Sequence, residues 1–270
     1  MSARKPVTIQ GPEDIRAFFD DLASDYRDLH GNAERLLRYR LGVIERLLGA
    51  VPRTAENGSR SHDETSSCNN TLLEIGCGNG MHLFALAHRF RRCIGVDLSP
   101  KMIAAAESVR RIHPLRERIE LFPAPAETLE GVRDTSVDVA LCVGVLEHIP
   151  NQEAALCQIR RVLKPGGACI CLTPNAGFLW HRWAPRLGRT CQYLSTDRFL
   201  DAGEARRMIR EAGLEMARLD YWRFVPRGDL SPLLGWGLTV LDWPGRWLHL
   251  AVLRGGLCFK AVRRAYPVDE

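Results

Sequence analysis

The sequence predicts an α/β fold in which helices cover both faces of a doubly wound, mostly parallel sheet. From Thr71 onward, short apolar runs of strand length alternate with segments of helical periodicity, a pattern typical of parallel strands joined by helices. A glycine-rich turn, EIGCGNG at 74–80, follows the first apolar run. Asp97 ends the second run, and ligands bind at the carboxyl ends of the strands in folds of this kind.

The composition indicates a globular, enzyme-sized chain and argues against several classes of function. The 270 residues suffice for one large domain or two small ones, and 46% are hydrophobic while 26% are charged. A net charge of +5 is too mild to indicate nucleic-acid binding. The nine cysteines include no Cys-x-x-Cys pair, so we expect neither a zinc knuckle nor a thioredoxin-type site.

The sequence also predicts a cytoplasmic protein. Several cysteines lie inside apolar runs such as ACICLT, where they are interpreted as buried thiols of a reducing compartment. The N-terminal segment MSARKPVTIQ lacks the apolar stretch of a secretory signal. No segment reaches the roughly 18 uninterrupted apolar residues of a membrane span.

The chain divides into a predicted helical cap, a linker and a core. Residues 1–50 form the cap, with two helices that break near residue 30. Residues 51–70 are polar and rich in turn formers, and predict a flexible linker. Residues 71–270 hold the core, with an apolar, tryptophan-rich insert at about 223–254. The apolar stripe of the first cap helix carries Ile15, Phe18, Phe19, Leu22 and Tyr26.

The core elements follow one another in a regular order. Five predicted strands alternate with helices, and these strands are TLLEIGCG, RCIGVDLS, IELFPAPAE, VDVALCVGV and GACICLTP. The predicted helices between them are MHLFALAHRF, KMIAAAESVRRIHP and NQEAALCQIRRVL. After a further helix, EARRMIREAGLE, the runs MARLDYWRFV and LCFKAVRR predict the last two strands.

The glycine-rich turn predicts a ligand site. Gly76, Gly78 and Gly80 allow a sharp turn, and they let a ligand approach the backbone without interference from a Cβ atom. A dinucleotide fingerprint would place its third glycine at Met81, and the Glu74 carboxylate would repel a pyrophosphate but suit an amino group. A glycine-rich turn without a ligand is the structural alternative.

Asp97 predicts a second anchor for the same ligand. A carboxylate at the end of the second strand can accept both hydroxyl hydrogens of a ribose. The alternative role is a helix N-cap, although Ser99 before Pro100 already offers that cap. Together, the glycine turn and Asp97 favour a ligand that carries a ribose.

Four segments in order resemble the successive motifs of a known family. LLEIGCGNG, IGVDLSPKMI, VDVALCVGVLEHIPN and IRRVLKPGGACICLTPN resemble class I S-adenosylmethionine-dependent methyltransferases, and are most similar to the ubiquinone/menaquinone-biosynthesis-like group. The resemblance covers about residues 71–175, and FFDDLASDYRDLH also resembles the N-terminal cap of that group. It implies a Rossmann-like methyltransferase fold with seven strands, the last of them antiparallel, and S-adenosyl-L-methionine as the methyl donor.

The resemblance implies a set of cofactor-binding residues, namely Glu74, Gly76, Cys77, Gly78, Asp97, Leu98, Met102, Ala126, Glu127, Val143 and Gly144. In this scheme, residues 76–78 pass under the methionine part of the cofactor. Glu74 orients that loop or reaches the cofactor's amino group through water. Val143 and Gly144 line the sulfonium side.

At the adenosine end, the resemblance implies that Asp97 holds the ribose hydroxyls and that Leu98 and Met102 pack against the adenine. The family usually has Asp-Ala-Glu in the loop after the third strand, whereas this chain has Pro-Ala-Glu at 125–127. Proline offers no side-chain acceptor. We therefore expect adenine recognition to depend on backbone groups near Ala126 or on Glu127, at a cost of about 1 kcal/mol for one lost hydrogen bond.

Methyl transfer from a sulfonium requires alignment, and it requires a base only when the acceptor is a hydroxyl or a protonated amine. His148, predicted to open the helix after the fourth strand, and Tyr26, whose ring can cover the cofactor's cation, are the candidate catalytic residues. His181, on a predicted substrate loop, is a further candidate. A structural role remains the alternative for each.

The sequence favours a site without metal. A metal-dependent subset of these methyltransferases carries Glu-x-x-Glu-His where this chain has Glu147 and His148, and the first glutamate of that pattern is Gly144 here. One carboxylate and one imidazole are too few ligands for a stable divalent ion.

The cap, the loop 176–195 and the insert are predicted to close over the methyl group. Their aromatic residues, which include all six tryptophans of the chain, suit an apolar or aromatic small molecule. Arg35, Arg38 and Arg40 could meet an anionic group, or they could form a solvated helix face. The segment 230–254 has the composition of a helix at a membrane interface, with packing over the core or in a homodimer as the alternative.

The sequence therefore predicts S-adenosylmethionine-dependent methylation of a small molecule, with oxygen preferred over carbon and nitrogen as the methylated atom. One alternative is a methyltransferase that acts on a lipid or quinone at the membrane surface. Another is a non-catalytic regulator that binds the cofactor. Met81 and Glu74 argue against a nicotinamide dehydrogenase.

Overall fold

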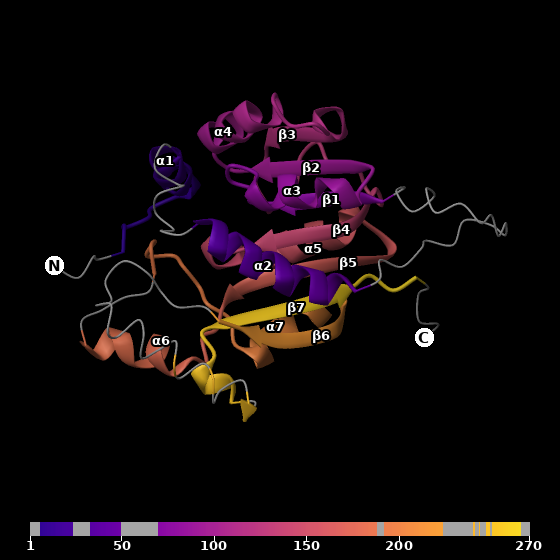
Figure 1. Ribbon diagram of the computed structural model, residues 1–270. Coiled ribbons are helices and arrows are strands. Elements are labelled where there is room, and N and C mark those ends of the chain that lie inside the picture. The colour runs from indigo at the N-terminus through magenta and orange to yellow at the C-terminus, as the bar shows by residue number, and fades with distance from the viewer. Residues whose placement is uncertain are drawn as a thin grey trace.

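In the computed structural model, a seven-stranded sheet has the strand order β3-β2-β1-β4-β5-β7-β6 (Figure 1). All neighbouring strands are parallel except β7, which runs antiparallel to both β5 and β6. The predicted seven-stranded, mostly parallel sheet and its antiparallel last strand are confirmed. The structure describes residues 6–23, 33–49, 70–187, 192–223, 240, 243, 247–248 and 250–265.

The strands match the predicted apolar runs, and they are β1 (Thr71–Ile75), β2 (Arg92–Asp97), β3 (Ile119–Pro123), β4 (Val137–Val143), β5 (Leu163–Pro174), β6 (Glu215–Trp222) and β7 (Gly256–Val262). Every residue of β1 and of β4 is buried, as expected for central strands covered on both faces. β5 begins earlier than the predicted run because Leu163 already pairs with Val137, before a register shift in the ladder.

The helices are α1 (Pro12–Leu22), α2 (Ala33–Leu48), α3 (Met81–Leu86), α4 (Pro100–Arg110), α5 (Gln152–Val162), α6 (Leu179–Trp183) and α7 (Ala202–Glu211). Short 3₁₀ turns complete the described elements, and they are η2 (Ala87–Arg89), η3 (Arg116–Arg118), η4 (Leu146–His148), η5 (Ala184–Leu187) and η6 (Ala251–Leu253). The hydroxyl oxygen of Ser99 accepts a hydrogen bond from the Met102 amide at 3.0 Å, which confirms the predicted cap of α4.

Two apolar clusters fill the space on either side of the sheet. Helices α2 and α3 contribute to one cluster, whereas α5 and α7 contribute to the other. Helix α2 places Val43, Ile44 and Leu47 against the sheet, so it belongs to the helical layer over that face (Figure 1). Helix α1 buries only Ile15 and lies beside α4, where it covers the carboxyl ends of the first strands.

One local prediction is wrong. His148 does not open the helix after β4; it ends the separate turn η4, and α5 begins four residues later. Pro150 explains the break, because a proline restricts the residue before it to extended conformations. Asn151 then starts α5 as its N-cap, and its side chain accepts from the Ala154 amide at 2.9 Å.

Several predicted segments fall on residues that the structure describes only in part. Tyr26 lies outside the described residues, as does the predicted linker except for Asn70. Most of the insert at about 223–254 also lies outside them. Among the described helices, none is long and apolar enough to cross a membrane.

Candidate functional site

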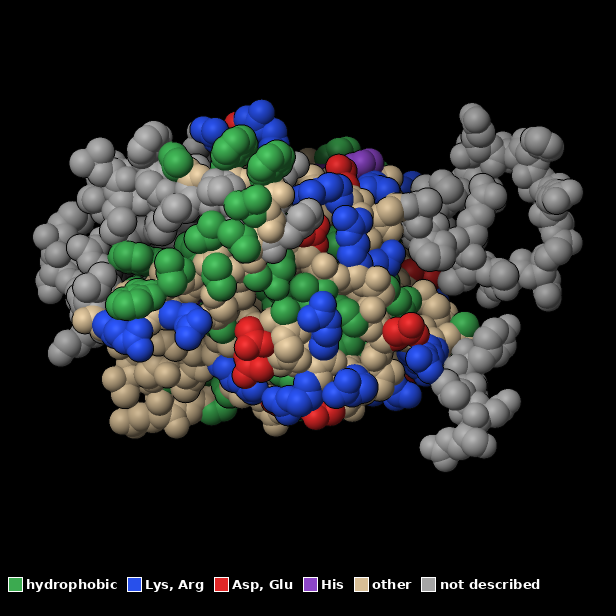
Figure 2. Space-filling model, turned by 90° about the horizontal axis from the view of Figure 1, so that it is seen from below, with side chains coloured by type: hydrophobic (Ala, Val, Ile, Leu, Met, Phe, Trp, Pro, Cys, Tyr) green, Lys and Arg blue, Asp and Glu red, His purple; other side chains and the backbone are tan. Residues whose placement is uncertain are grey.

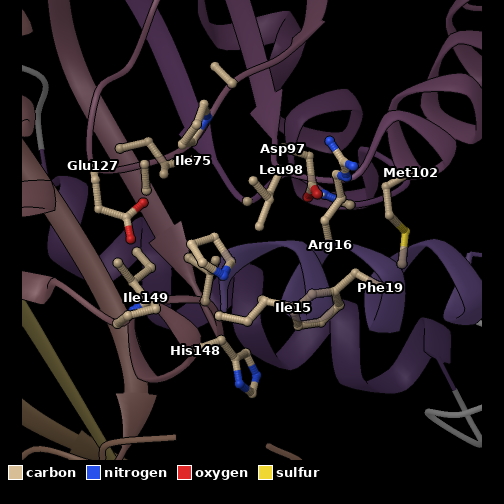
Figure 3. A pocket seen from close by; sticks show the side chains of 18 of the residues that line it. Ile15, Arg16, Phe19, Ile75, Asp97, Leu98, Met102, Glu127, His148 and Ile149 are labelled. Atoms are coloured by element: carbon tan, nitrogen blue, oxygen red, sulfur yellow. The ribbon is translucent and has the colours of Figure 1, made fainter. Parts of the chain in front are cut away.

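A cavity of about 460 Å³ opens at the carboxyl ends of β1, β2 and β4, a volume in the range of small-molecule sites. The strand order runs outward in one direction from β1 to β3 and in the other direction from β4 onward, so the cavity at the β1–β4 boundary occupies the switch point where doubly wound sheets bind ligands. Its walls come from the loops after β1 to β4, while α1 adds Ile15, Arg16 and Phe19 from the cap (Figure 3).

The loop after β1 is tightly packed and requires glycine. The φ angles of Gly76, Gly78 and Gly80 are +63°, +52° and +80°, a region that L-residues with side chains rarely adopt. A Cβ atom on Gly76 would lie 2.2 Å from a methyl carbon of Val145. Gly76 and Gly78 line the cavity, whereas the side chain of Cys77 is buried away from it, so Cys77 offers only its backbone.

Glu74 is a buried carboxylate with one oxygen lacking a partner. Its Oε1 lies 3.1 Å from Nδ1 of His82, the second residue of α3, which the sequence did not suggest as a functional residue. Its Oε2 is buried and has no hydrogen-bond partner. A buried polar atom of this kind requires a donor, and an amino group, directly or through water, would supply one.

Asp97 is held by the glycine loop. Its Oδ2 accepts from the Gly78 amide at 2.8 Å, and its Oδ1 accepts from the Ser99 amide at 2.9 Å. Burial raises the pKa of Asp97 to about 6, although these hydrogen bonds lower it. Each carboxylate oxygen keeps a further lone pair, so the side chain can accept two hydroxyl hydrogens from a ligand in the cavity.

The remaining walls suit a planar base between apolar groups. Leu98 and Met102 line the cavity next to Asp97, and Ala126 and Glu127 line its other side. In Figure 3, the carboxylate of Glu127 faces the space across from Asp97 and Leu98. The two acceptors of Asp97 and these walls fit the ribose and adenine parts of S-adenosylmethionine, whereas Glu74 is buried and is not among the residues that line the cavity.

The sequence predicts the sulfonium side of the site at the end of β4. Gly144 lines the cavity with φ +66°, whereas Val143 is buried behind it and does not. A Cβ atom on Gly144 would lie 3.8 Å from Oε1 of Glu147 and 3.9 Å from Nη2 of Arg40, so two charged side chains converge here. Arg40 also stacks over Trp222, with 5.7 Å between its guanidinium carbon and the ring centroid.

The side chain of Glu147, near Gly144, is directed into the protein interior. Its Oε2 accepts from the Thr173 hydroxyl at 3.0 Å, and burial raises the pKa of Glu147. Among the residues that the structure describes, no three His, Cys, Asp or Glu side chains are placed to hold a metal ion.

His148 lines the cavity and forms a pair with Asp197. Their Nδ1 and Oδ1 atoms lie 2.7 Å apart, and the ring of Phe19 packs edge-on against the imidazole at 5.4 Å. Figure 3 shows the imidazole beyond Ile15 and Phe19, away from Asp97 and Glu127. Sequence reasoning missed Asp197 because it lies 49 residues from His148 in an irregular loop.

Other predicted candidates lie elsewhere. The Nδ1–H group of His181 donates to the Asn175 carbonyl at 2.7 Å, and burial lowers the pKa of His181 to about 4. No tryptophan is among the described residues that line this cavity. Trp222 is buried in the core, and the side chains of Trp243 and Trp247 are 73% and 77% exposed. Hydrogen bonds that the indole of Trp222 donates to the backbone of β5 and β7 hold this residue in the core.

Comparison with known proteins agrees with this geometry. The methyltransferase domain family matches residues 73–171. The ubiquinone biosynthesis O-methyltransferase of Idiomarina loihiensis is 30% identical over 247 residues, which cover 86% of this chain and 88% of that relative. The protein of the same name from Aromatoleum aromaticum is 28% identical over 227 residues, which cover 79% and 84% of the two chains.

A solved structure shows the same fold. The magnesium protoporphyrin IX methyltransferase of Synechocystis PCC 6803, with bound SAH, superposes with a TM-score of 0.64 at 14% identity, over 94% of this chain and 100% of that chain. One conclusion follows from the ordered motifs, the strand order, the cavity at the switch point and the relative that matches over most of its length. The chain belongs to the class I S-adenosylmethionine-dependent methyltransferases, in the ubiquinone-biosynthesis-like group, and is an enzyme that uses S-adenosylmethionine.

Proposed function

We propose that the enzyme methylates a hydroxyl oxygen of a small apolar or aromatic acceptor, with His148 as the general base. The observation that carries this proposal is that His148 lines the same cavity as Gly76, Gly78 and Asp97. A histidine near neutrality can take the proton of a phenol, whereas an amine that is already neutral needs no base. The names of the relatives, as O-methyltransferases, support the same choice.

The cofactor, when bound, supplies a methyl group on a sulfonium, which is already activated for transfer. The chain's own residues bind and align the reactants. In our assignment, the glycine loop and Asp97 hold the two halves of the cofactor. Glu74 contributes its partnerless oxygen, and Glu127 replaces the adenine acceptor that Pro125 lacks. Cys77 acts through its backbone and Val143 by packing behind Gly144.

The acceptor end of the cavity is apolar. Helix α1 contributes Ile15 and Phe19, and the turn after β4 contributes Ile149 and Pro150. These side chains suit a flat or hydrocarbon-bearing molecule. If His148 is the base, the reactive hydroxyl of that molecule must lie beside it. A phenol satisfies both requirements. Tyr26, whose ring is proposed to cover the cation of the cofactor, lies outside the described residues.

The test is methylation with isotope-labelled S-adenosylmethionine of a matched acceptor panel that contains phenols, catechols, anilines and aliphatic alcohols. We expect label on the oxygen of a phenolic acceptor, identified by mass spectrometry. His148→Gln should lower kcat by about 10²–10⁴-fold, the usual contribution of a general base, with the dissociation constant of S-adenosylhomocysteine unchanged within about twofold. Label found only on nitrogen or carbon, or a fully active His148→Gln variant, would contradict the proposal.

A second candidate function, action on a lipid or quinone at a membrane surface, is favoured by one specific observation. Exposed apolar side chains gather in the described part of the C-terminal insert, and they are Val240, Trp243, Trp247, Leu248, Leu250 and Val252. Figure 2 shows hydrophobic side chains gathered on one face of the molecule, with lysine and arginine side chains along their border. Tryptophan and leucine beside cations are typical of interfacial segments.

Co-sedimentation with vesicles tests this candidate. We expect binding to vesicles that contain phosphatidylglycerol, and loss of binding in Trp243→Ser/Trp247→Ser with unchanged turnover of a soluble phenol. If the wild-type protein leaves these vesicles unbound and instead forms a dimer that the double variant disrupts, the patch is a homodimer interface. A membrane contact of this kind is compatible with the proposed cytoplasmic location.

A further inference from the structure

Asp197 lies in the loop between α6 and α7, far in sequence from every methyltransferase motif. We propose that Asp197 is a positioning residue for methyl transfer, which fixes the tautomer of His148 and stabilises its protonated form. This inference rests on the proposed function, because it assigns the partner of the proposed base. It stands on the geometry of the pair and of the loop that holds it.

The pair is short and enclosed. Nδ1 of His148 and Oδ1 of Asp197 are 2.7 Å apart, the side chain of Asp197 is fully buried, and that of His148 is 11% exposed. Charge-assisted hydrogen bonds of this length in an enclosed setting are stronger than exposed ones. The imidazole is therefore held in one orientation, between the rings of Phe19 and Tyr193.

Asp197 is itself held by its own loop. Its Oδ2 accepts from the amides of Tyr193 at 2.8 Å and Leu194 at 3.0 Å. Since both donors point at Oδ2, the carboxylate acts as an acceptor, and its Oδ1 is left to accept from the imidazole. The side-chain amide of Gln192 also donates to the Asp197 carbonyl at 2.6 Å, which ties the residue at its backbone.

This arrangement decides the chemistry of the ring. Because Nδ1–H donates to Asp197, Nε2 carries the lone pair and can accept a proton. Burial lowers the pKa of His148, but the hydrogen bond that the imidazole donates to Asp197 and the charges of Glu147 and Asp197 outweigh it, so the pKa is raised. Among the described residues, the titratable groups that face the imidazole are Asp197 and Tyr193 from the loop and Glu147 from its own turn. Helix α1 contributes the uncharged Phe19, and its Glu13 and Arg16 line the same cavity.

The step balances in atoms and charge. The acceptor's hydroxyl proton moves to Nε2 of His148 while the acceptor oxygen forms a bond to the methyl carbon. The electron pair of the carbon–sulfur bond remains on sulfur, which becomes a neutral thioether. The imidazolium that forms is paired with Asp197, and it returns its proton to solvent after the product leaves.

A purely structural role is the alternative that the test must separate. The same loop is tied to the N-terminal segment, because the Val7 amide donates to the Tyr193 carbonyl at 2.9 Å and the Ile9 amide donates to the Ser195 hydroxyl at 2.9 Å. It is also tied to the turn of His148, through the Arg198 amide and the Glu147 carbonyl at 2.9 Å. Loss of Asp197 could therefore act by loosening the loop.

The experiment compares Asp197→Asn with Ser195→Ala, a matched control that cuts a tether of the same loop without touching His148. For Asp197→Asn we expect kcat on a phenol to fall by about 10²–10⁴-fold, because the amide favours the wrong tautomer, while acceptor KM changes less than about threefold. The rising limb of kcat against pH should move to lower pH, since removal of a negative partner lowers the imidazole pKa. Ser195→Ala should keep the wild-type kcat and pH profile.

A measurement without turnover separates this inference from the proposed function. NMR titration of the histidine Cε1–Hε1 signals, with the His148 signal assigned from the His148→Gln spectrum, should show a lower pKa for His148 in Asp197→Asn. An unchanged NMR pKa and pH profile would overturn the inference, as would an equal loss of kcat in Ser195→Ala. If the NMR shift is observed but the wild-type enzyme methylates only nitrogen or carbon, the proposed function fails and Asp197 loses its catalytic role.

Discussion

The two ends of the cavity are built in different ways. The cofactor end consists of a glycine loop and an aspartate that directly follow adjacent strands, and hydrogen bonds within 19 residues of sequence join them. The acceptor end joins η4 to a loop 49 residues away, and that loop in turn contacts a segment 186 residues away in sequence. Backbone geometry therefore governs the cofactor end, and long-range contacts govern the acceptor end.

The largest expected effect breaks the cofactor end at its backbone. Gly76→Ala places a Cβ atom 2.2 Å from Val145, at a φ angle of +63°. Strain and overpacking of this kind cost about 2–5 kcal/mol together, so the loop should shift and cofactor affinity should fall by more than about 100-fold. Calorimetry with S-adenosylhomocysteine measures the loss, and Gly76→Ala/Val145→Ala should recover part of it. Near-normal affinity in the single variant would show that the loop accommodates the added Cβ atom without disturbing the cofactor site.

A smaller effect is expected when the charge of the same end is removed. Asp97→Asn should lower the affinity for S-adenosylhomocysteine by about 10–100-fold, because hydrogen bonds to a charged acceptor are lost. Because the pKa of Asp97 is raised to about 6, wild-type affinity should weaken as the pH falls through 6, when the carboxylate gains a proton. The stability of the cofactor-free protein should change in the opposite sense, since this group's burial penalty is relieved as the pH falls from 6 towards 4.

Calorimetric titration with S-adenosylhomocysteine between pH 5 and pH 8 checks the sign for the affinity, and denaturant unfolding of the cofactor-free protein between pH 4 and pH 8 checks the sign for the stability. Asp97→Asn should show an affinity that does not depend on pH in this range. A wild-type protein whose affinity is flat across pH 6 would show that Asp97 does not contact the cofactor.

At the acceptor end, Phe19→Ala should raise acceptor KM by about tenfold, as expected for loss of one aromatic contact. The dissociation constant of S-adenosylhomocysteine should stay within about threefold of the wild-type value, because the ring of Phe19 packs against the imidazole of His148. Steady-state kinetics with varied acceptor, together with calorimetry, separates the two quantities. An equal loss in both would mean that α1 serves the two ends alike, and the contrast between them would then fail.

A gain of function sharpens the account of adenine recognition. Pro125→Asp restores the acceptor that related enzymes carry, and it should tighten S-adenosylhomocysteine by up to about fivefold, the equivalent of about 1 kcal/mol. Glu127→Gln in the wild-type background should weaken binding, and in the Pro125→Asp background it should have less effect. If Glu127→Gln is silent in both backgrounds, backbone groups alone recognise the adenine.

The smallest expected effect is that of metal removal. Gly144 stands where metal-dependent relatives carry a carboxylate, and Glu147 is directed towards Thr173. Dialysis against a chelator should therefore leave kcat within about 20% of the untreated value, because a divalent ion needs more oxygen and nitrogen ligands than this pair supplies. Loss of activity that magnesium or zinc restores would overturn this expectation.

The sequence predicted the glycine turn after β1, the aspartate at the end of β2 and the serine cap of α4, because these features are local. Glycines at fixed spacing, an aspartate at a strand end and a serine before a proline each act through backbone geometry over a few residues, so their roles can be inferred from their neighbours. The same local rules failed for His148, whose helix was misplaced because Pro150 moved the start of α5 to Gln152. They also gave no sign that His82 contacts Glu74.

By itself, the sequence determined the order of strands and helices, the antiparallel last strand by family resemblance, and the residues that follow each strand at the switch point. Alternating hydrophobicity and turn chemistry act at short range, so they are visible in a single chain. Only the tertiary structure decided that Asp197 meets His148, that Trp222 fills the core, and that α2 covers the sheet while α1 borders the cavity. These contacts depend on how segments that are distant in sequence pack together. Such packing involves many buried groups at once, so no short stretch of the sequence indicates it.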